Sequence, residues 1–213
     1  MIIPGKEVWY GWNGGNEWLF RQINGIQGGD LYNALMIFLT RIGDYRNFPY
    51  YMGTFLVWAL IEFVINKTHR KGGTSHRVIA WIAVFMVLIA SYATDGLVVK
   101  TIKTQFAYPR PYIVLPANDV ILLDQKNGDD DYHSFPSGHA SFVTVMVVGL
   151  WPVLSINMCW FGMALIVGVC WSRIAVGMHF PADVLAGFFI SLLLVLILRS
   201  IIYQLLNKCN IRC

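Results

Sequence analysis

The sequence predicts an all-α fold, a polytopic bundle of transmembrane helices, and three observations support this. Hydrophobic residues make up 56% of the 213-residue chain and charged residues only 13%, which leaves too little polar surface for an ordinary soluble domain. Several apolar runs approach or reach the roughly 18 to 25 residues that are needed to cross hydrocarbon. No strand-like alternation is visible, and a helix satisfies its own backbone hydrogen bonds in lipid.

The first 47 residues predict helices that lie at the membrane interface. Residues 17–27 carry Trp18, Phe20 and Ile23 at roughly helical spacing among polar residues, as an interfacial amphipathic helix does. Residues 31–42 are apolar but too few to cross alone, so they form either a second interfacial helix or the lower part of a bent span. No cleavable signal peptide is visible in this region, because it has no continuous apolar core.

Residues 48–207 are expected to form the transmembrane core of one domain that covers residues 1–213. Five apolar runs predict spans, at residues 48–65, 78–98, 140–151, 158–171 and 181–206. We therefore expect five crossings, or six if residues 31–42 are inserted. The basic segment 67–77 should face the cytoplasm by the positive-inside rule. Counting crossings from there places three polar segments on the opposite face, at residues 100–111, 134–139 and 172–183.

Two polar features leave alternatives open. Asp95 is either a partner for the neighbouring cations or a helix-surface residue that faces the bundle. Residues 113–135 are many for a connection, and long ordered loops often act as lids or binding loops. The acidic run at 129–131 is either solvated or takes part in headgroup selection or cation binding.

The remaining composition argues against several classes of site. The formal net charge of +4 is modest and the basic residues are dispersed, so nothing indicates a nucleic-acid partner. The cysteines show no metal-site spacing and predict no disulfide framework, and the pair at the tail is either lipidated or unmodified. They are Cys159, Cys170, Cys209 and Cys213. We expect no metal and no cofactor.

The segment 172–183 places Arg173, His179 and Asp183 between two apolar runs. Ionisable residues this close to hydrocarbon are costly, and they usually line a cavity or pair with a neighbour. Pro181 is suited to the first position of a helix, which puts Asp183 in the first turn. Asp183 can then accept a hydrogen bond from one ring nitrogen of His179 and leave the other nitrogen free to attack, as in an activated histidine nucleophile.

The other two segments carry groups that suit a phosphate. Lys103 and Arg110 offer a point charge and a forked donor, although cations beside a span are also common as snorkelling anchors. Ser137 and Gly138 open an apolar helix, where free backbone N–H groups and the helix dipole favour an anion; the alternative is a simple helix cap. His139 follows on the first turn and can give a proton to a leaving oxygen.

The three segments resemble the signature of the type 2 phosphatidic acid phosphatase (PAP2) superfamily. That signature is Lys, six residues and Arg-Pro; then Pro-Ser-Gly-His; then Ser-Arg, five residues, His, three residues and Asp, and every defining position matches in order. The motifs cover about the last half of the chain. The resemblance implies the PAP2 fold, which usually has six spans, and a metal-independent phosphatase.

The resemblance also implies a role for each matched residue. The phosphoryl group would be held by Lys103, Arg110, Arg173, Ser137 and the Gly138 backbone. His179 would attack phosphorus to give a phosphohistidine, His139 would protonate the leaving group and then activate water, and Asp183 would steady His179. Phosphoryl transfer depends mainly on positioning and on neutralising the equatorial oxygens, so these cations suit the reaction.

The predicted function is an integral membrane lipid phosphatase that acts on the non-cytoplasmic face. Candidate substrates are undecaprenyl diphosphate, phosphatidylglycerol phosphate, phosphatidic acid and lipid A phosphates. One alternative is a phosphotransferase with the same site. A second is a vanadate-binding oxidase, although so apolar a chain disfavours it. A third is a non-catalytic transporter or receptor of anionic lipid, which the presence of two histidines disfavours. We expect a bacterial inner membrane with the site facing the periplasm, a eukaryotic endomembrane being the alternative. The sequence does not predict the oligomeric state.

Overall fold

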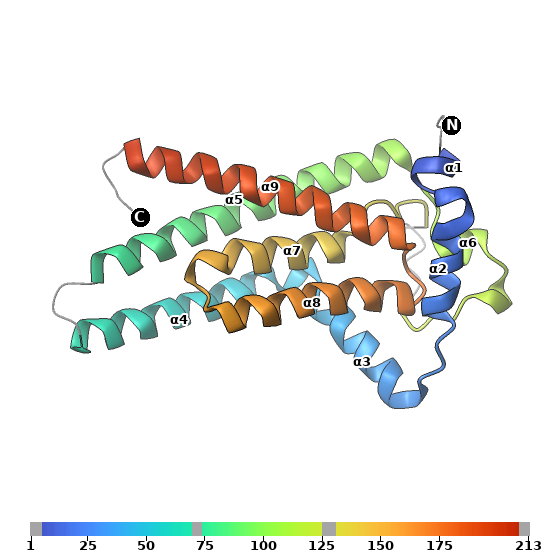
Figure 1. The fold of residues 1–213 in the computed structure, drawn as a ribbon, viewed down its shortest axis with the longest axis horizontal. Helices are drawn as coiled ribbons and strands as arrows, with labels where there is room; N and C mark the ends of the chain where they lie inside the picture. Colours follow the sequence, from blue (N-terminus) through green and yellow to red (C-terminus); the bar gives the residue numbers. More distant parts are fainter. Residues whose placement is uncertain (1–5, 70–73, 125–130, 209–213) are drawn as a thin grey trace.

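The computed structural model describes residues 6–69, 74–124 and 131–208, and within these ranges the protein is helical, with no strand (Figure 1). The all-α prediction is therefore confirmed. The helices are α1 (Lys6–Trp9), α2 (Gly15–Asn24), α3 (Gly29–Ile42), α4 (Phe48–His69), α5 (Thr74–Phe106), α6 (Pro111–Val114), α7 (Gly138–Leu150), α8 (Ile156–Ala175) and α9 (Pro181–Lys208). Short 3-10 turns are η1 (Trp12–Gly14), η2 (Tyr45–Asn47), η3 (Ala117–Asp119) and η5 (Trp151–Val153).

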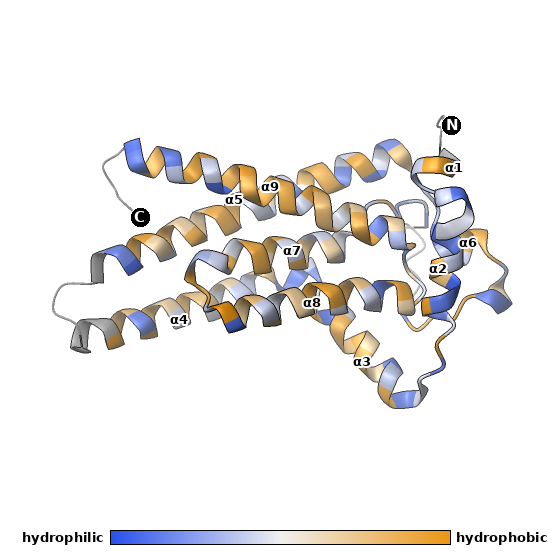
Figure 2. Cartoon of the chain, viewed as in Figure 1, coloured by the Kyte–Doolittle hydropathy of each residue, from blue (hydrophilic) through white to orange (hydrophobic). Residues whose placement is uncertain are grey.

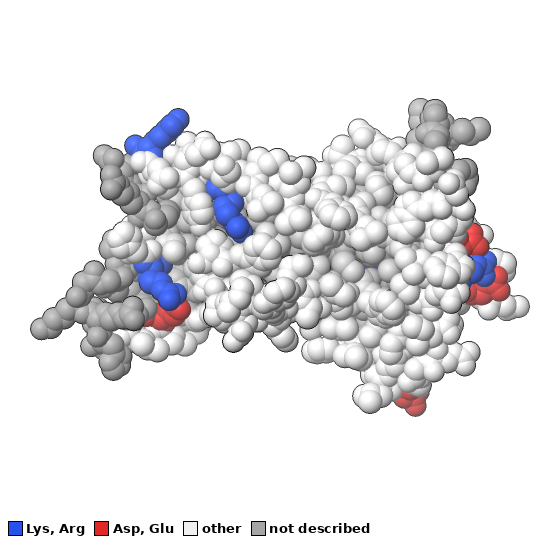
Figure 3. Space-filling model, viewed as in Figure 1, with Lys and Arg blue, Asp and Glu red and all other residues white. Residues whose placement is uncertain are grey.

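Among the described residues, four helical segments are long and apolar enough to cross a membrane. They are Tyr45–Ile65, His76–Val114, Ile156–Ala175 and Pro181–Lys208. The long helices are mostly apolar along their length, and many of their polar residues lie toward the ends (Figure 2). On the face drawn in Figure 3, most of the charged side chains likewise gather toward the two ends. These four segments account for four of the five predicted crossings.

The fifth predicted crossing is α7, which is shorter and lies at the centre of the bundle. It packs against α5, α8 and α9, and each of its residues from Ala140 to Leu150 is buried. A helix that is enclosed by others on all sides is apolar all round, which explains why this run shows no polar face in the sequence.

A polar contact joins three helices inside the bundle. Asp95 on α5 is 6% exposed and accepts hydrogen bonds from Ser141 of α7 and Ser191 of α9, both at 2.6 Å. The two serine hydroxyls also contact each other. Asp95 therefore faces the bundle, which was one of the two alternatives from the sequence.

The N-terminal helices α1 and α2 lie at one end of the bundle, the right-hand end in Figure 1. There α2 packs against the end of α8 and the start of α9. An amphipathic helix was predicted at 17–27, and α2 (Gly15–Asn24) is such a helix, with Phe20 and Ile23 on its buried face. Its buried face contacts protein, with the Phe20 ring 5.2 Å from that of Phe180. Helix α3 has 14 residues, packs on α8 and tilts away from the bundle.

Several predictions fall on or beside segments that the structure does not describe. Part of the basic segment 67–77, at residues 70–73, and the tail cysteines lie outside the described residues, as do Asp129 and Asp130. Asp131 is not simply solvated: its Oδ1 accepts from the Tyr112 hydroxyl at 2.7 Å, and its carbonyl accepts from the Arg110 backbone N–H at 2.9 Å. Cys159 and Cys170 are free thiols.

Candidate active site

The start of α9 fixes the histidine and aspartate pair predicted from the sequence. Pro181 is the first residue of the helix, as expected, and Asp183 lies in its first turn. The Asp183 carboxylate reaches back to accept the Phe180 backbone N–H at 2.9 Å, so it caps the helix that carries it. The same oxygen, Oδ2, lies 3.3 Å from Nδ1 of His179. One short segment therefore positions both groups.

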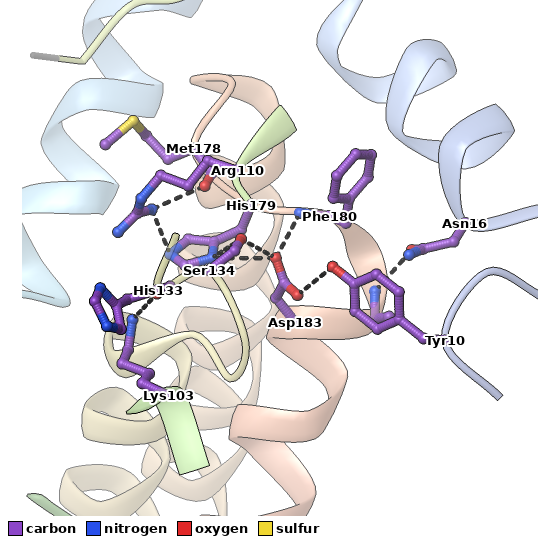
Figure 4. A network of polar contacts seen from close by, with 11 residues as sticks. Tyr10, Asn16, Lys103, Arg110, His133, Ser134, Met178, His179, Phe180 and Asp183 are labelled. Carbon is purple, nitrogen blue, oxygen red and sulfur yellow. Dashed lines mark hydrogen bonds and ion pairs between the residues drawn. The ribbon is translucent and has the colours of Figure 1, made fainter. Parts of the chain in front are cut away.

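Two further donors hold the Asp183 carboxylate, which is completely buried (Figure 4). Ser134 donates to Oδ2 at 2.5 Å, and the hydroxyl of Tyr10 donates to Oδ1 at 2.9 Å. The side chain of Asn16 accepts from the Ala182 backbone N–H at 2.9 Å and ties η1 and α2 to the same helix start. A buried carboxylate needs such donors, because removal from water without them is costly.

The second nitrogen of His179 faces a cation. Nε2 lies 3.2 Å from Nη1 of Arg110, and arginine has donors but no acceptor. Nε2 therefore accepts, which places the ring proton on Nδ1, in agreement with the contact to Asp183. Burial is the largest cause that lowers the pKa of His179 well below 6.5, followed by the charges of Arg110 and Arg173. The imidazole is thus neutral and presents a lone pair beside a guanidinium.

Three cations from two predicted segments lie at the same end of the bundle as this ring. Arg110 also donates to the Met178 carbonyl at 2.9 Å, and Lys103 donates to the His133 carbonyl. Arg173, near the end of α8, pairs with Asp124 at 3.0 Å. The charges of all three cations help to lower the pKa of His179, so this end of the bundle favours an anion.

The start of α7 completes this end of the bundle. Ser137 is the N-cap of α7 and Gly138 its first residue, and the Ser137 N–H donates to the Asp183 carbonyl at 2.9 Å. The Ser137 hydroxyl is buried and has no hydrogen-bond partner within the described part of the chain. His139 is half-buried on the first turn of α7. An anion at this helix start would meet free backbone donors and an unpaired hydroxyl.

All eight residues that the sequence singled out therefore gather at one end of the bundle. They are Lys103, Arg110, Ser137, Gly138, His139, Arg173, His179 and Asp183. In the described ranges no group of three or more His, Cys, Asp or Glu side chains is close enough together to hold a metal ion.

Four residues that shape the site had no predicted role: Tyr10, Asn16, Asp124 and Ser134. Tyr10 and Asn16 lie more than 160 positions before their partners, so no local pattern could reveal them. Ser134 is the first residue of the second predicted segment, two residues before the Pro-Ser-Gly-His motif, and a lone serine there does not indicate a contact with Asp183. Asp124 lies in the 113–135 connection and carried no recognisable motif.

Comparisons with known proteins identify the family. The family model of the PAP2 superfamily matches residues 80–207. An undecaprenyl-diphosphatase of Sulfolobus acidocaldarius is 32% identical over 179 residues, which cover 84% of this chain and 74% of that protein.

Two solved structures share the fold. LpxE of Aquifex aeolicus aligns with a TM-score of 0.62 at 22% identity, over 87% of this chain and 94% of that one. A transmembrane PAP2-type phosphatidylglycerolphosphate phosphatase of Bacillus subtilis aligns with a TM-score of 0.58, also at 22% identity, over 90% and 86% of the two chains.

Proposed function

The chain belongs to the PAP2 superfamily and is a membrane phosphatase of that family, and from this premise we propose that it removes phosphate from a phosphorylated membrane lipid by attack of His179. The observation that carries the proposal is the state of His179. Its Nδ1 is directed at a buried carboxylate, and its Nε2 lone pair faces Arg110 of the first signature segment. Such a ring is a nucleophile that awaits an electrophilic phosphorus.

The first step forms a bond from His179 Nε2 to phosphorus and breaks the bond from phosphorus to the lipid oxygen or bridging oxygen. His139 gives its proton to that oxygen as it leaves. The phosphorylated ring carries positive charge, which the Asp183 carboxylate offsets through the Nδ1 proton.

The second step returns the enzyme to its first state. His139, now neutral, takes a proton from a water molecule as that water attacks phosphorus, and the bond to Nε2 breaks. Inorganic phosphate then leaves. Lys103, Arg110 and Arg173 offset the charge on the phosphoryl oxygens in both steps, and the start of α7 adds backbone donors. These groups supply the charge that a magnesium ion supplies elsewhere, so we propose a metal-independent reaction.

The substrate is proposed to be a lipid diphosphate or phosphomonoester. The relative from Sulfolobus acidocaldarius is named for undecaprenyl diphosphate, which makes a polyprenyl diphosphate the first candidate. Phosphatidylglycerol phosphate, phosphatidic acid and lipid A phosphates are the others. The site lies at one end of helices long enough to span a bilayer, so a lipid can keep its tail in hydrocarbon while its phosphate reaches the site.

We infer the sidedness from the charge pattern. The end of α4 and the start of α5, which flank the basic segment 67–77, are at the opposite end of the bundle from the site, and the positive-inside rule assigns that segment to the cytoplasm. We propose that the site faces the outer side of a bacterial inner membrane.

The test is phosphate release by the purified protein from a panel of these lipids, with EDTA present. Hydrolysis of at least one lipid by the wild type, and its loss in His179→Ala, is expected. His76→Ala is the matched control, since His76 is exposed at the distal start of α5. Phosphate that appears on a second lipid instead of in water would identify a phosphotransferase, and turnover by His179→Ala would exclude the proposed nucleophile.

A further inference from the structure

We propose that Asp124 is an affinity-determining residue, an internal anion that competes with phosphate for Arg173 and so limits binding and promotes product release. The inference rests on the proposed function, because it takes Arg173 as a phosphate-binding residue. Asp124 itself lies outside the three signature segments.

The contact between the two side chains is asymmetric. Arg173 Nη1 lies 3.0 Å from Asp124 Oδ2, and the arginine side chain is 3% exposed whereas the aspartate side chain is 37% exposed. A guanidinium that is buried this far needs a counter-charge, which the carboxylate supplies. A carboxylate and a phosphate offer the same kind of anionic oxygen to an arginine. Asp124 is thus placed where a phosphate oxygen would bind.

Two contacts of the other cations of the site go to neutral acceptors. Lys103 donates to the His133 carbonyl and Arg110 to the Met178 carbonyl. A phosphate outcompetes a neutral carbonyl readily, because charge-assisted hydrogen bonds are about twice as strong. At Arg173 the phosphate has to displace Asp124, a group of its own sign.

Asp124 is held in this position by the segment that carries it. The Leu123 N–H donates to the Val176 carbonyl at 3.2 Å, only three residues beyond Arg173. The side chain of Asn24 pairs with both backbone groups of Ile121, at 2.7 and 2.8 Å. The contact between Asp124 and Arg173 is therefore built into the fold.

The glycine that follows Arg173 by four residues allows this close approach. Gly177 has φ +82°, and a Cβ there would come within 2.6 Å of the Ile121 carbonyl oxygen. A side chain at this position would push residues 120–124 away from the pocket.

Competition follows from the charges. A phosphate dianion and the Asp124 carboxylate repel each other when both approach one guanidinium. Since the aspartate is more than a third exposed, it can turn into water when phosphate enters, and it can return to Arg173 once the lipid has gone. This return weakens the hold on inorganic phosphate, the product that would otherwise occupy the pocket.

The experiment compares Asp124→Asn with Asp119→Asn in the full-length protein. Asp119 is in the same segment and its replacement removes the same charge, but its carboxylate pairs with the exposed Arg21 of α2 instead of with Arg173. Affinity for inorganic phosphate is measured in two ways, as product inhibition of hydrolysis and as the phosphate-dependent rise in unfolding temperature. We expect Asp124→Asn to bind phosphate about two to five times more tightly, which corresponds to an ion pair with one exposed partner, and Asp119→Asn to match the wild type.

The thermal measurement needs no turnover, so it separates the inference from the proposed function. If the wild type hydrolyses no lipid phosphate, but the Asp124→Asn variant still binds inorganic phosphate more tightly than the wild type, only the proposed function is refuted. In an Arg173→Gln background, Asp124→Asn should have no effect on phosphate affinity. Unchanged or weaker phosphate binding by Asp124→Asn, or an equal effect of Asp119→Asn, would overturn the competition.

Discussion

Replacing Asp183 by Asn tests how the buried carboxylate acts on His179. Oδ2 faces donors from Phe180, Ser134 and His179, whereas Oδ1 faces the Tyr10 hydroxyl, which can accept as well as donate. The amide NH₂ of the variant therefore fits at the Oδ1 position, and its oxygen remains at the Oδ2 position. His179 keeps an acceptor for its Nδ1 proton, and so keeps its tautomer, but loses the negative charge beside it.

The size of the effect follows from that difference. A hydrogen bond to a charged group is worth about 1.5–3 kcal/mol and a neutral one about 0.5–1.5 kcal/mol, and the charge on the phosphohistidine ring is left without its partner. We expect a loss of about 2–3 kcal/mol of transition-state stabilisation, or about 10²-fold in kcat at nearly constant KM. The assay is phosphate release at saturating lipid phosphate, with the unfolding temperature of each variant measured alongside.

Asp183→Ala serves as the comparison, because it removes both the charge and the acceptor and should lose much more than the asparagine variant. A loss for Asp183→Asn as large as that of Asp183→Ala would refute the deduced amide orientation. Full activity would show that the charge of Asp183 plays no part.

Three other expectations follow from contacts of single residues. Burial and neighbouring cations lower the pKa of His179, so its protonated form appears only at low pH. The acid limb that this group gives to the pH profile of kcat/KM should therefore lie below pH 6.5. A limb at or above that pH would contradict a neutral resting state of His179. Tyr10→Phe keeps the ring in its aromatic cluster but removes a donor to Asp183, so thermal denaturation in detergent should show a loss of about 1.5–3 kcal/mol in unfolding free energy. The control Tyr92→Phe should lose little stability, because the Tyr92 hydroxyl makes only a long 3.4 Å contact. Equal losses in the two variants would exclude the Asp183 contact as the cause. Asp95→Asn can still bridge Ser141 and Ser191, so this variant should unfold near the wild-type temperature. Asp95→Ala leaves both serines without their shared acceptor and should be less stable by about 1–3 kcal/mol. If Asp95→Asn proves as unstable as Asp95→Ala, the carboxylate charge itself is required.

The parts of the site that were predictable are governed by short-range geometry. Pro181 starts a helix because its missing N–H costs nothing there, and this places Asp183 on the first turn within reach of His179. The gathering of the three segments followed from counting spans. Both steps need only local rules and the thickness of a membrane.

The parts that were missed depend on tertiary contacts. Tyr10 meets Asp183 because α1 and η1 fold over the end of the bundle, and the amphipathic pattern of residues 17–27 gave only the side that is buried, not the partner. Asp124 meets Arg173 through backbone contacts of Leu123 and Ile121, which any residue type could make. Nothing in their immediate sequence reports such contacts.

The covalent intermediate provides the most direct test of the mechanism. The wild type and a His139→Ala variant would be mixed with an aryl phosphate labelled in its phosphoryl group, whose leaving oxygen needs no proton, and quenched before turnover is complete. Since His139 is needed to activate water but not to release this leaving group, label bound to His179 should accumulate in His139→Ala beyond the wild-type level, as located by mass spectrometry of peptides. Label on any other side chain, or no covalent label in either protein while phosphate is still released, would contradict nucleophilic attack by His179.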